Sequence, residues 1–521
     1  MNPTQPGKIF WLVVLAGFWA LYGLTGRDAW QTEEALALAP ILDWLTGSAT
    51  PWAAPAPFHA LVAGLFARAA PFGLDIQDSA RLASGLFTLV TLLATAFAAR
   101  GLLGIGFGAP AALALLGGFG WMLRAHALIP ETAWLAVWAC LLWGMALARS
   151  QPKAGGMLFG VCLAILTLGL RGLPDLAAGL VLLLAPLALR DWRETQYRRA
   201  LKWGLGMAVA LILAGMAVMA QQGQLDAWVR WHGMQRFVPT LAATKLLSEL
   251  AWFAWPLWPL ALAALWHDHR RLGRAPALHL PLIAVVVFLP AALLPAWSRV
   301  GALLPLLLPL TLLAALALAH LRRGAAQGFY WFGALCFLFF GVAFWVYFAA
   351  IEWGMPAKLA AHVARLTPSY RPGAVDEAAI WLAAGASLLW LVAIPLFPRA
   401  QTRPVLVWGT GMLLVWVLLA SLFRPWAEAG WGYRPMIADM ARHLPSGACL
   451  AADVEPGVAA MLRYHLAGRN AVNARADCPW RLGQVPRVGG KLAPKTDHTV
   501  WQGFRPRYKG QVYRLEHLRE E

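Results

Sequence analysis

The chain has 521 residues, of which 60% are hydrophobic and only 13% are charged, and its mean hydropathy is +0.59. This composition excludes a soluble globular protein, in which about a quarter of the residues would be charged. The net charge of +18 is compatible with nucleic-acid binding, but most basic residues lie in short links between apolar segments. Membrane topology explains that placement better, so we expect no nucleic-acid partner.

Apolar segments of about 20 residues recur along the chain, which is the length that crosses a bilayer core of about 30 Å. The segments are near-continuous rather than alternating, and this favours helices over a barrel. We predict 13 spans: 9–25, 78–99, 107–123, 130–148, 156–172, 173–189, 203–221, 248–266, 278–296, 300–320, 328–350, 377–397 and 404–423. The first is interpreted as a retained span, with a cleaved signal peptide as the alternative. The fifth and sixth are nearly fused.

Basic residues fix the predicted orientation. With the N-terminus inside, Lys8 and 15 further Lys and Arg residues fall in seven cytoplasmic segments, the richest being 190-RDWRETQYRRALK-202. The opposite loops are longer and hold most of the acids, in agreement with the positive-inside rule. An odd number of spans then places the C-terminus outside.

The outer segment 26–77 is too long for a simple turn. It contains two amphipathic stretches, 32–47 and 57–73, separated by the proline-rich 50-TPWAAPAP-57. We expect two helices that lie on the outer membrane face.

The tail from 424 to 521 is polar and differs sharply from the membrane domain, 1–423. Its pattern predicts helices at 434–445 and 456–468, a strand at 447–454 and a hairpin at 498–518. The fold class is therefore an α-helical polytopic membrane protein with a small extracytoplasmic α/β domain. Cys449 and Cys478 are the only cysteines of the tail, and outside the cytoplasm they can form a disulfide. The other three cysteines lie in apolar segments without a CxxC pair, so no zinc or redox motif is predicted.

Ionisable residues gather on the predicted outer side, although charges near spans are costly and usually face a cavity or a partner. They are Glu33, Glu34, Arg81, Arg124, His126, Glu131, Arg171, Asp175, Arg230, His232, Arg236, Lys245, Glu249 and Arg299. They either solvate loop ends or form a site. A site is favoured for Glu33, Glu34 and Glu131, each of which sits beside a span start with little other acid nearby. Carboxylates deprotonate hydroxyls or hold divalent metal ions, and arginines clamp phosphates.

Several motifs occur in an order that resembles the class C membrane glycosyltransferases. The branch in question contains the aminoarabinose lipid A transferase and the protein O-mannosyltransferases. In 30-WQTEEALALAPILDW-44, Glu33 and Glu34 take the places of the family's Asp-Glu pair. The further matching stretches are 78–87, 124–141 with Glu131, 160–174 with Arg171, 231–237 with His232 and Arg236, 252–260, and 297–315. The sequence departs from the family at Leu36, where an arginine is expected, and at 53-AAPAPF-58, which lacks a lysine.

The resemblance implies a transferase that uses one sugar carried on polyprenyl (undecaprenyl) phosphate. The sugar would pass, with inversion, to a hydroxyl of a lipid, a glycan or a protein on the periplasmic face of a bacterial inner membrane. Glu33 would act as base or as the carboxylate that orients the acceptor, assisted by Glu34 and Glu131. Arg171, Arg236 and Arg299 would stabilise the departing phosphate, with Lys245 behind them. His232, Arg81 and Arg230 would support the acceptor, and Glu33, Glu131 and His232 are the set that could hold a divalent metal ion.

Two other functions remain open at this stage. A transporter or lipid flippase would carry charges near the bilayer midplane and an internal repeat. A non-catalytic, glycan-binding membrane protein would use its outer domain alone, and the missing Lys and Arg keep this alternative open.

Overall fold

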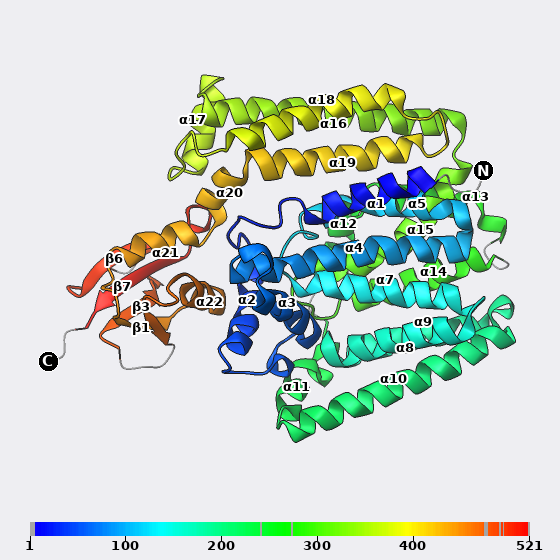
Figure 1. Cartoon of the computed structure of the whole chain (residues 1–521), viewed down its shortest axis with the longest axis horizontal. Coiled ribbons are helices and arrows are strands. Elements are labelled where there is room, and N and C mark those ends of the chain that lie inside the picture. Colours follow the sequence, from blue (N-terminus) through cyan, green and yellow to red (C-terminus); the bar gives the residue numbers. More distant parts are fainter. Residues whose placement is uncertain are drawn as a thin grey trace.

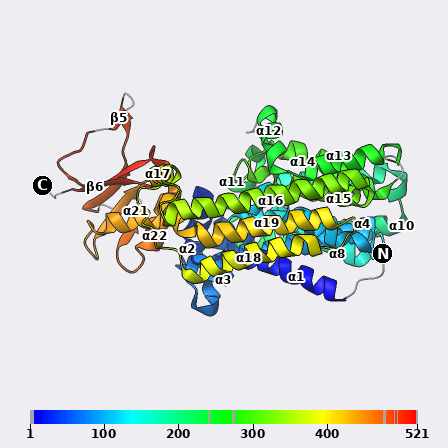
Figure 2. The ribbon, with the colours of Figure 1, turned by 90° about the horizontal axis from the view of Figure 1, so that it is seen from above.

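The computed structural model describes residues 6–239, 242–271, 275–473, 478–488, 491–492 and 494–518. The molecule is elongated, with a bundle of long helices and a smaller sheet-containing domain at one end (Figures 1 and 2). The first helix begins near the opposite end of the bundle, so the two ends of the chain lie far apart along the long axis.

Eight helices among the described residues are long and apolar enough to cross a membrane. They are α4 (Ile76–Leu103), α7 (Pro130–Ala148), α8 (Pro152–Gly169), α10 (Thr195–Gln221), α15 (Leu304–His320), α16 (Arg323–Glu352), α18 (Glu377–Leu396) and α19 (Arg403–Leu422). In the apolar stretches of α7 and α15 83% of the residues are buried, against 11% in α18. The first two therefore form the centre of the bundle, while α18 and α10 form opposite edges (Figure 1). This confirms a helical polytopic membrane protein.

The predicted span 248–266 is not one straight helix. It is divided into α12 (Ala243–Phe253) and α13 (Leu257–His267), which meet at an angle of 94°. Pro256 lies at the break and has no N–H to continue the helical hydrogen bonds. The pair gives a ninth candidate span if it is counted as one.

The four remaining predicted spans correspond to shorter apolar helices: α1 (Pro6–Leu21), α5 (Gly108–Leu116), α9 (Leu173–Leu184) and α14 (Pro276–Ala291). The predicted span 107–123 ends early, and the chain turns into α6 (Phe119–Met122). At this turn the indole N–H of Trp408 donates to the Gly117 carbonyl at 2.8 Å, and a Cβ on Gly117 would lie 2.4 Å from the ring. The count of 13 spans stays a prediction.

The two amphipathic stretches of 26–77 form helices as predicted, namely α2 (Thr32–Leu45) and α3 (Pro57–Ala69). Two further short helices, α11 (Leu225–His232) and α17 (Ala357–Leu366), were not predicted. All of them lie at the end of the bundle that carries the sheet domain (Figures 1 and 2).

The C-terminal domain is a mixed sheet with helices, which confirms the predicted α/β fold of the tail. Its helices are α20 (Arg424–Trp431), α21 (Arg434–Ala441) and α22 (Pro456–His465), and its strands are β1 (Cys449–Asp453), β2 (Ala471–Asn473), β3 (Trp480–Gln484), β6 (Thr499–Phe504) and β7 (Val512–His517). The order is β2-β1-β3-β7-β6, with β1 parallel to β2 and β3, and with the predicted hairpin β6–β7 antiparallel. Two short strands, β4 (Arg487–Val488) and β5 (Lys491–Leu492), pair separately. Cys449 and Cys478 are joined by a disulfide, with Cα atoms 5.3 Å apart.

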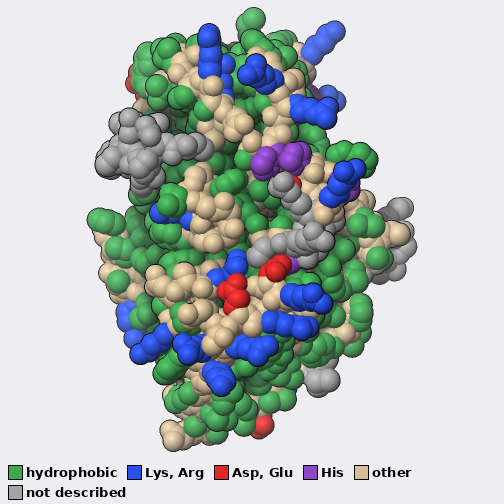
Figure 3. All heavy atoms as spheres, turned by 90° about the vertical axis from the view of Figure 1, so that its right-hand side faces the viewer, with side chains coloured by type: hydrophobic (Ala, Val, Ile, Leu, Met, Phe, Trp, Pro, Cys, Tyr) green, Lys and Arg blue, Asp and Glu red, His purple; other side chains and the backbone are tan. Residues whose placement is uncertain are grey.

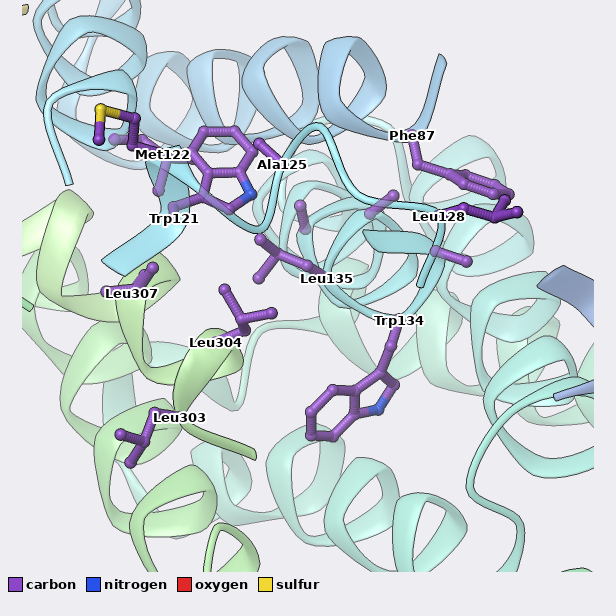
Figure 4. Packing of buried hydrophobic residues seen from close by; sticks show 14 of the residues in the cluster. Phe87, Trp121, Met122, Ala125, Leu128, Trp134, Leu135, Leu303, Leu304 and Leu307 are labelled. Carbon is purple, nitrogen blue, oxygen red and sulfur yellow. The ribbon is translucent and has the colours of Figure 1, made fainter. Parts of the chain in front are cut away.

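The core runs between the central helices. Leu135 of α7 points towards Leu304, the first residue of α15, as Figure 4 shows, and both are fully buried. This packing holds the first turns of α7 and α15, the two central helices, next to one another.

Basic side chains gather over the end of the bundle opposite the sheet domain, where acidic side chains are few (Figure 3). The link 190–202 begins there with the turn Arg190–Trp192. This is the end that we predict to be cytoplasmic.

Candidate active site

A cavity of about 280 Å³ opens at the domain-bearing end of the bundle, between α2, α3 and the start of α7. Its walls are mostly apolar and include two tryptophans. The lining residues are Glu33, Leu36, Ala37, Pro40, Pro55, Ala56, His59, Ala60, Pro130, Trp231, Arg236, Ala296 and Trp297. One carboxylate, one guanidinium and one imidazole therefore meet in a largely apolar space, which is the usual composition of a small-molecule site.

Glu33 is half-buried in the first turn of α2 and lines the cavity. Among the described residues no ion pair holds its carboxylate. The N-terminal end of a helix favours a negative charge there. Leu36, one turn further on, is 42% exposed and also lines the cavity. The position where the resemblance predicts an arginine is therefore apolar.

Glu34 is only 1% exposed and is fully occupied by other parts of the chain. Arg27 donates to both of its oxygens at 2.7 and 3.0 Å, and Arg81 Nε lies 3.6 Å from Oε1. The backbone N–H groups of Trp30 and Leu128 also donate to it, at 3.0 and 3.1 Å. Burial alone would raise the pKa of Glu34, but the charges of Arg27 and Arg81 outweigh it and lower the pKa to about 2. This carboxylate stays ionised and has no free position for substrate.

Asp28 ties the same segment to the C-terminal domain. It is fully buried, and its Oδ2 accepts from the backbone N–H groups of Tyr433 and Arg434 at 2.7 and 2.6 Å, at the start of α21. Its Oδ1 lies 3.1 Å from His465 Nε2, at the end of α22. An ion pair connects the C-terminal end of α2 to α22, because Arg463 Nη2 lies 2.6 Å from Asp43 Oδ1. The domain therefore holds α2 at both ends.

Glu131 is completely buried at the start of α7. Its Oε1 accepts from Arg124 at 3.0 Å and from the Ser298 hydroxyl at 2.6 Å. A Cβ on Gly301 would lie 2.3 Å from the same oxygen, so the carboxylate is tightly enclosed. Its neighbours Pro130 and Trp297 line the cavity, but Glu131 itself does not.

Arg236 and Arg171 are two of the residues that the sequence predicts to bind the phosphate. Arg236 lines the cavity beside Trp231, whose carbonyl accepts from its Nε at 2.5 Å. Arg171 is 5% exposed, lies over the Trp134 ring at 4.8 Å and is 3.8 Å from Asp175. The attraction of Arg171 to Asp175 outweighs its repulsion by the positive charge of Arg236. Within the described part of the chain, Arg171 Nε and Nη1 are buried without a hydrogen-bond partner.

The other predicted residues lie outside the cavity lining. His232 is buried, and its ring stacks on that of Trp228 with the ring centroids 5.3 Å apart. A Cβ added at Gly172 would lie 2.5 Å from the Cβ of His232. Arg299 pairs with Glu249 at 2.7 Å. Lys245 and Arg230 are exposed on α12 and α11. Arg81 is fully buried and bonds Asp78 and the carbonyls of Leu24 and Arg27.

The predicted metal set is not assembled. Among the described residues, no group of three or more His, Cys, Asp and Glu side chains lies close enough to hold a metal ion. The reason is that Glu131 is enclosed by Arg124 and Ser298, while His232 is packed against Gly172 and Trp228. We therefore derive no step through a metal.

Four residues that matter in the structure were missed in the sequence. Arg27 and Asp28 lie just before the motif that begins at Trp30, and the Arg27–Glu34 spacing of seven residues was the available signal. Ser298 gave no signal of its own. His59 was detectable as a lone imidazole inside the apolar stretch 57-PFHALVAGLF-66.

Comparisons with known proteins agree with this fold. No protein-family model and no curated protein sequence matches the chain. Among solved structures, the chain resembles ArnT from Cupriavidus metallidurans bound to undecaprenyl phosphate, with a TM-score of 0.65 and 19% identity over 91% of this chain and 87% of that one. The apo state of the same protein gives a TM-score of 0.65 over 91% and 86%. The predicted resemblance to the class C transferases is thus confirmed at the level of the fold.

Proposed function

We propose that this chain is a class C glycosyltransferase that moves one sugar from polyprenyl phosphate to a hydroxyl acceptor, with inversion. The observation that carries the proposal is the outer-end cavity, in which the open carboxylate of Glu33 and the guanidinium of Arg236 share one largely apolar space. The ArnT-like fold supports it, because the similar structure holds undecaprenyl phosphate.

Glu33 is the proposed base. The acceptor hydroxyl attacks the anomeric carbon as Glu33 takes its proton, and the bond from that carbon to the phosphate oxygen breaks on the opposite side. General base catalysis of this kind contributes about 10²- to 10⁴-fold. Glu34 and Glu131 are positioning residues in this scheme. Arg27 holds both oxygens of Glu34, while Arg124 and Ser298 hold Oε1 of the enclosed Glu131.

Arg236, with Arg171 behind it, stabilises the departing phosphate. A departing phosphate would attract both guanidinium groups, and its developing negative charge would strengthen that attraction. We assign a secondary role to three exposed residues, which would contact the lipid phosphate or the acceptor: Arg299, Lys245 and Arg230. Their exposed positions suit a transient contact better than a fixed one.

The same proposal includes the arrangement in the membrane. The domain 1–423 would cross a bacterial inner membrane 13 times with the N-terminus in the cytoplasm, and the domain 424–521 would lie in the periplasm. The acceptor is a lipid such as lipid A, another glycan or a protein. The chain lacks the arginine expected at position 36 and the lysine expected in 53–58, so the proposal names neither one sugar nor one acceptor.

The test is conversion of labelled undecaprenyl-phosphate sugars by the purified full-length protein, with the anomeric configuration of the product read by NMR. We expect transfer with inversion, and a loss of about 10²- to 10⁴-fold for Glu33→Ala. Equal turnover by wild type and Glu33→Ala would overturn the mechanism. Movement of intact lipid across vesicles without bond cleavage would instead identify a flippase.

A further inference from the structure

His59 lines the cavity with Glu33 and Arg236, but the proposed reaction gives this imidazole no role. It lies in the first turn of α3, which begins at Pro57, and it is 1% exposed. Its ring packs 6.3 Å from Phe87 of α4, and the same residue borders the cavity that contains Glu33 and Arg236. The side chain therefore bridges the packed interior of the bundle and the candidate active site.

Packing alone does not require an imidazole here. The other buried residues of α3 include Ala60, Ala63 and Gly64, all small and without polar side-chain atoms. Within the described residues, His59 Nε2 is buried and has no hydrogen-bond partner. Burying a polar nitrogen without a partner is unfavourable, and an apolar side chain of the same size would avoid that cost.

A second buried histidine, His126, differs from His59 because both of its ring nitrogens have partners. His126 is also fully buried, but its Nδ1 lies 3.0 Å from the Met122 carbonyl and its Nε2 lies 2.5 Å from the Trp19 carbonyl. Both nitrogens of His126 are thus satisfied by the protein. His59 Nε2 lacks such a partner, and His59 lines the cavity, so a polar group bound in the cavity would supply a partner for this nitrogen.

The chemistry of that group follows from the charge of the imidazole. Burial lowers the pKa of His59 to about 3, so the ring is neutral at pH 7. A neutral imidazole offers one N–H donor and one acceptor nitrogen, which matches a hydroxyl group. It does not neutralise a phosphate, and Arg236 in the same cavity already offers a positive charge for that purpose.

We propose that His59 is a substrate-contacting residue that hydrogen-bonds a sugar or acceptor hydroxyl in the cavity with Glu33. The inference rests on the proposed glycosyl transfer and adds a specificity contact to it. The hydroxyl comes either from the transferred sugar or from the acceptor, and the two sources share the same chemistry.

The test compares His59→Phe, which keeps a planar ring but removes both nitrogens, with His59→Gln, which retains a donor and an acceptor. Full-length protein is assayed with undecaprenyl-phosphate sugars and hydroxyl acceptors, each varied at saturation of the other. The matched control is His443→Phe, because His443 is exposed on the C-terminal domain. We expect His59→Phe to raise KM about tenfold for one substrate, with a smaller change in kcat. His59→Gln should bring that KM most of the way back to the wild-type value.

The substrate whose KM rises identifies the source of the hydroxyl. A deoxy analogue of that substrate should then bind wild type and His59→Phe equally, because the lost contact is the same one. Thermal unfolding should show His59→Phe to be at least as stable as wild type, and if this variant does not fold, His59→Leu replaces it.

The outcomes separate the two proposals. Unchanged KM values for both substrates in an active, folded His59→Phe enzyme would overturn the role of His59 and leave the transferase function standing. A wild-type protein that cleaves no sugar from any of the lipids would overturn both. A rise in KM that Gln does not relieve would contradict the hydrogen bond and indicate a packing role.

Discussion

Glu33 and Glu34 are adjacent in the sequence but belong to two different regions of the molecule. Glu33 faces a cavity with a mostly apolar lining and no ion pair within the described chain. Glu34 lies in a closed polar cluster with Arg27, Arg81 and two backbone N–H groups. Consecutive residues of a helix point in directions about 100° apart, so one turn of α2 can serve both regions.

Two adjacent acidic residues therefore need not share one role. Glu34 is held by Arg27 and Arg81, whereas Glu33 lines the cavity and is the residue that we propose as the base. Asp28 extends the fixed region, because it connects the segment before α2 to α21 and α22. The cavity therefore has one rigid wall, which is a condition for positioning a base to within a fraction of an ångström.

The largest expected effect on stability is that of Glu34→Ala. The substitution leaves Arg27 and Arg81 buried without their carboxylate, and breaking a buried pair costs about 3–5 kcal/mol. Thermal unfolding in detergent or nanodiscs measures it. Glu33→Ala, its neighbour, should change the free energy of unfolding by less than about 1 kcal/mol. Equal losses for the two variants would remove the distinction between the regions.

Arg236→Ala should act on activity rather than on stability. Loss of a charged hydrogen bond to the lipid phosphate predicts a fall in kcat/KM of about 10- to 100-fold. Arg236→Lys should recover part of the loss, since lysine retains the charge but not the planar fork. Arg365, exposed on α17, supplies the control substitution. An unaffected Arg236→Ala would place the phosphate elsewhere.

Asp28→Asn tests the rigid wall. The amide oxygen can still accept from the N–H groups of Tyr433 and Arg434. The new NH2 group then faces the Ala29 N–H and His465, where the carboxylate had an acceptor, and the expected cost is about 1–3 kcal/mol. Hydrogen exchange should rise in α21 and α22, and turnover should fall with it. Asp43→Asn, which breaks only the part-exposed pair with Arg463, should cost about 0–1 kcal/mol. Faster exchange confined to the Asp43 variant would reverse this order.

The last prediction concerns the dependence of stability on pH in acid. The pKa of Glu34 is lowered from 4.5 to about 2 in the folded protein, so its contribution is complete above about pH 4.5 and is lost as the pH falls towards 2. The unfolding midpoint of wild type should fall across this window more steeply than that of Glu34→Gln. Parallel curves for the two proteins would show that the carboxylate is not held by its arginines.

Much of the fold was predictable because it depends on apolar length and on turn chemistry. The apolar runs predicted the long helices, the two outer amphipathic stretches predicted α2 and α3, and the tail pattern predicted its α/β domain. The break at Pro256 and the early end of α5 at Leu116 were not predicted. They depend on a proline at a helix junction and on the approach of Trp408 to Gly117, which comes from 291 residues away.

The site was predictable only in part, for a similar reason. Glu33 and Arg236 do lie in one cavity, whereas Glu131 and His232, predicted with them, are enclosed by Ser298, Arg124, Trp228 and Gly172. Residue type shows what a side chain can do, but its availability is decided by partners from distant segments. Arg27 settles the role of Glu34 in this way.

The most direct test of the account is the single-turnover rate of Glu33→Gln at saturating donor and acceptor. The amide keeps the size of the side chain and removes only its ability to take a proton. The account predicts a folded protein that binds the lipid donor as wild type does, with a rate lower by about 10²- to 10⁴-fold. A folded Glu33→Gln enzyme with the wild-type rate would contradict the claim that the open member of the pair is the base.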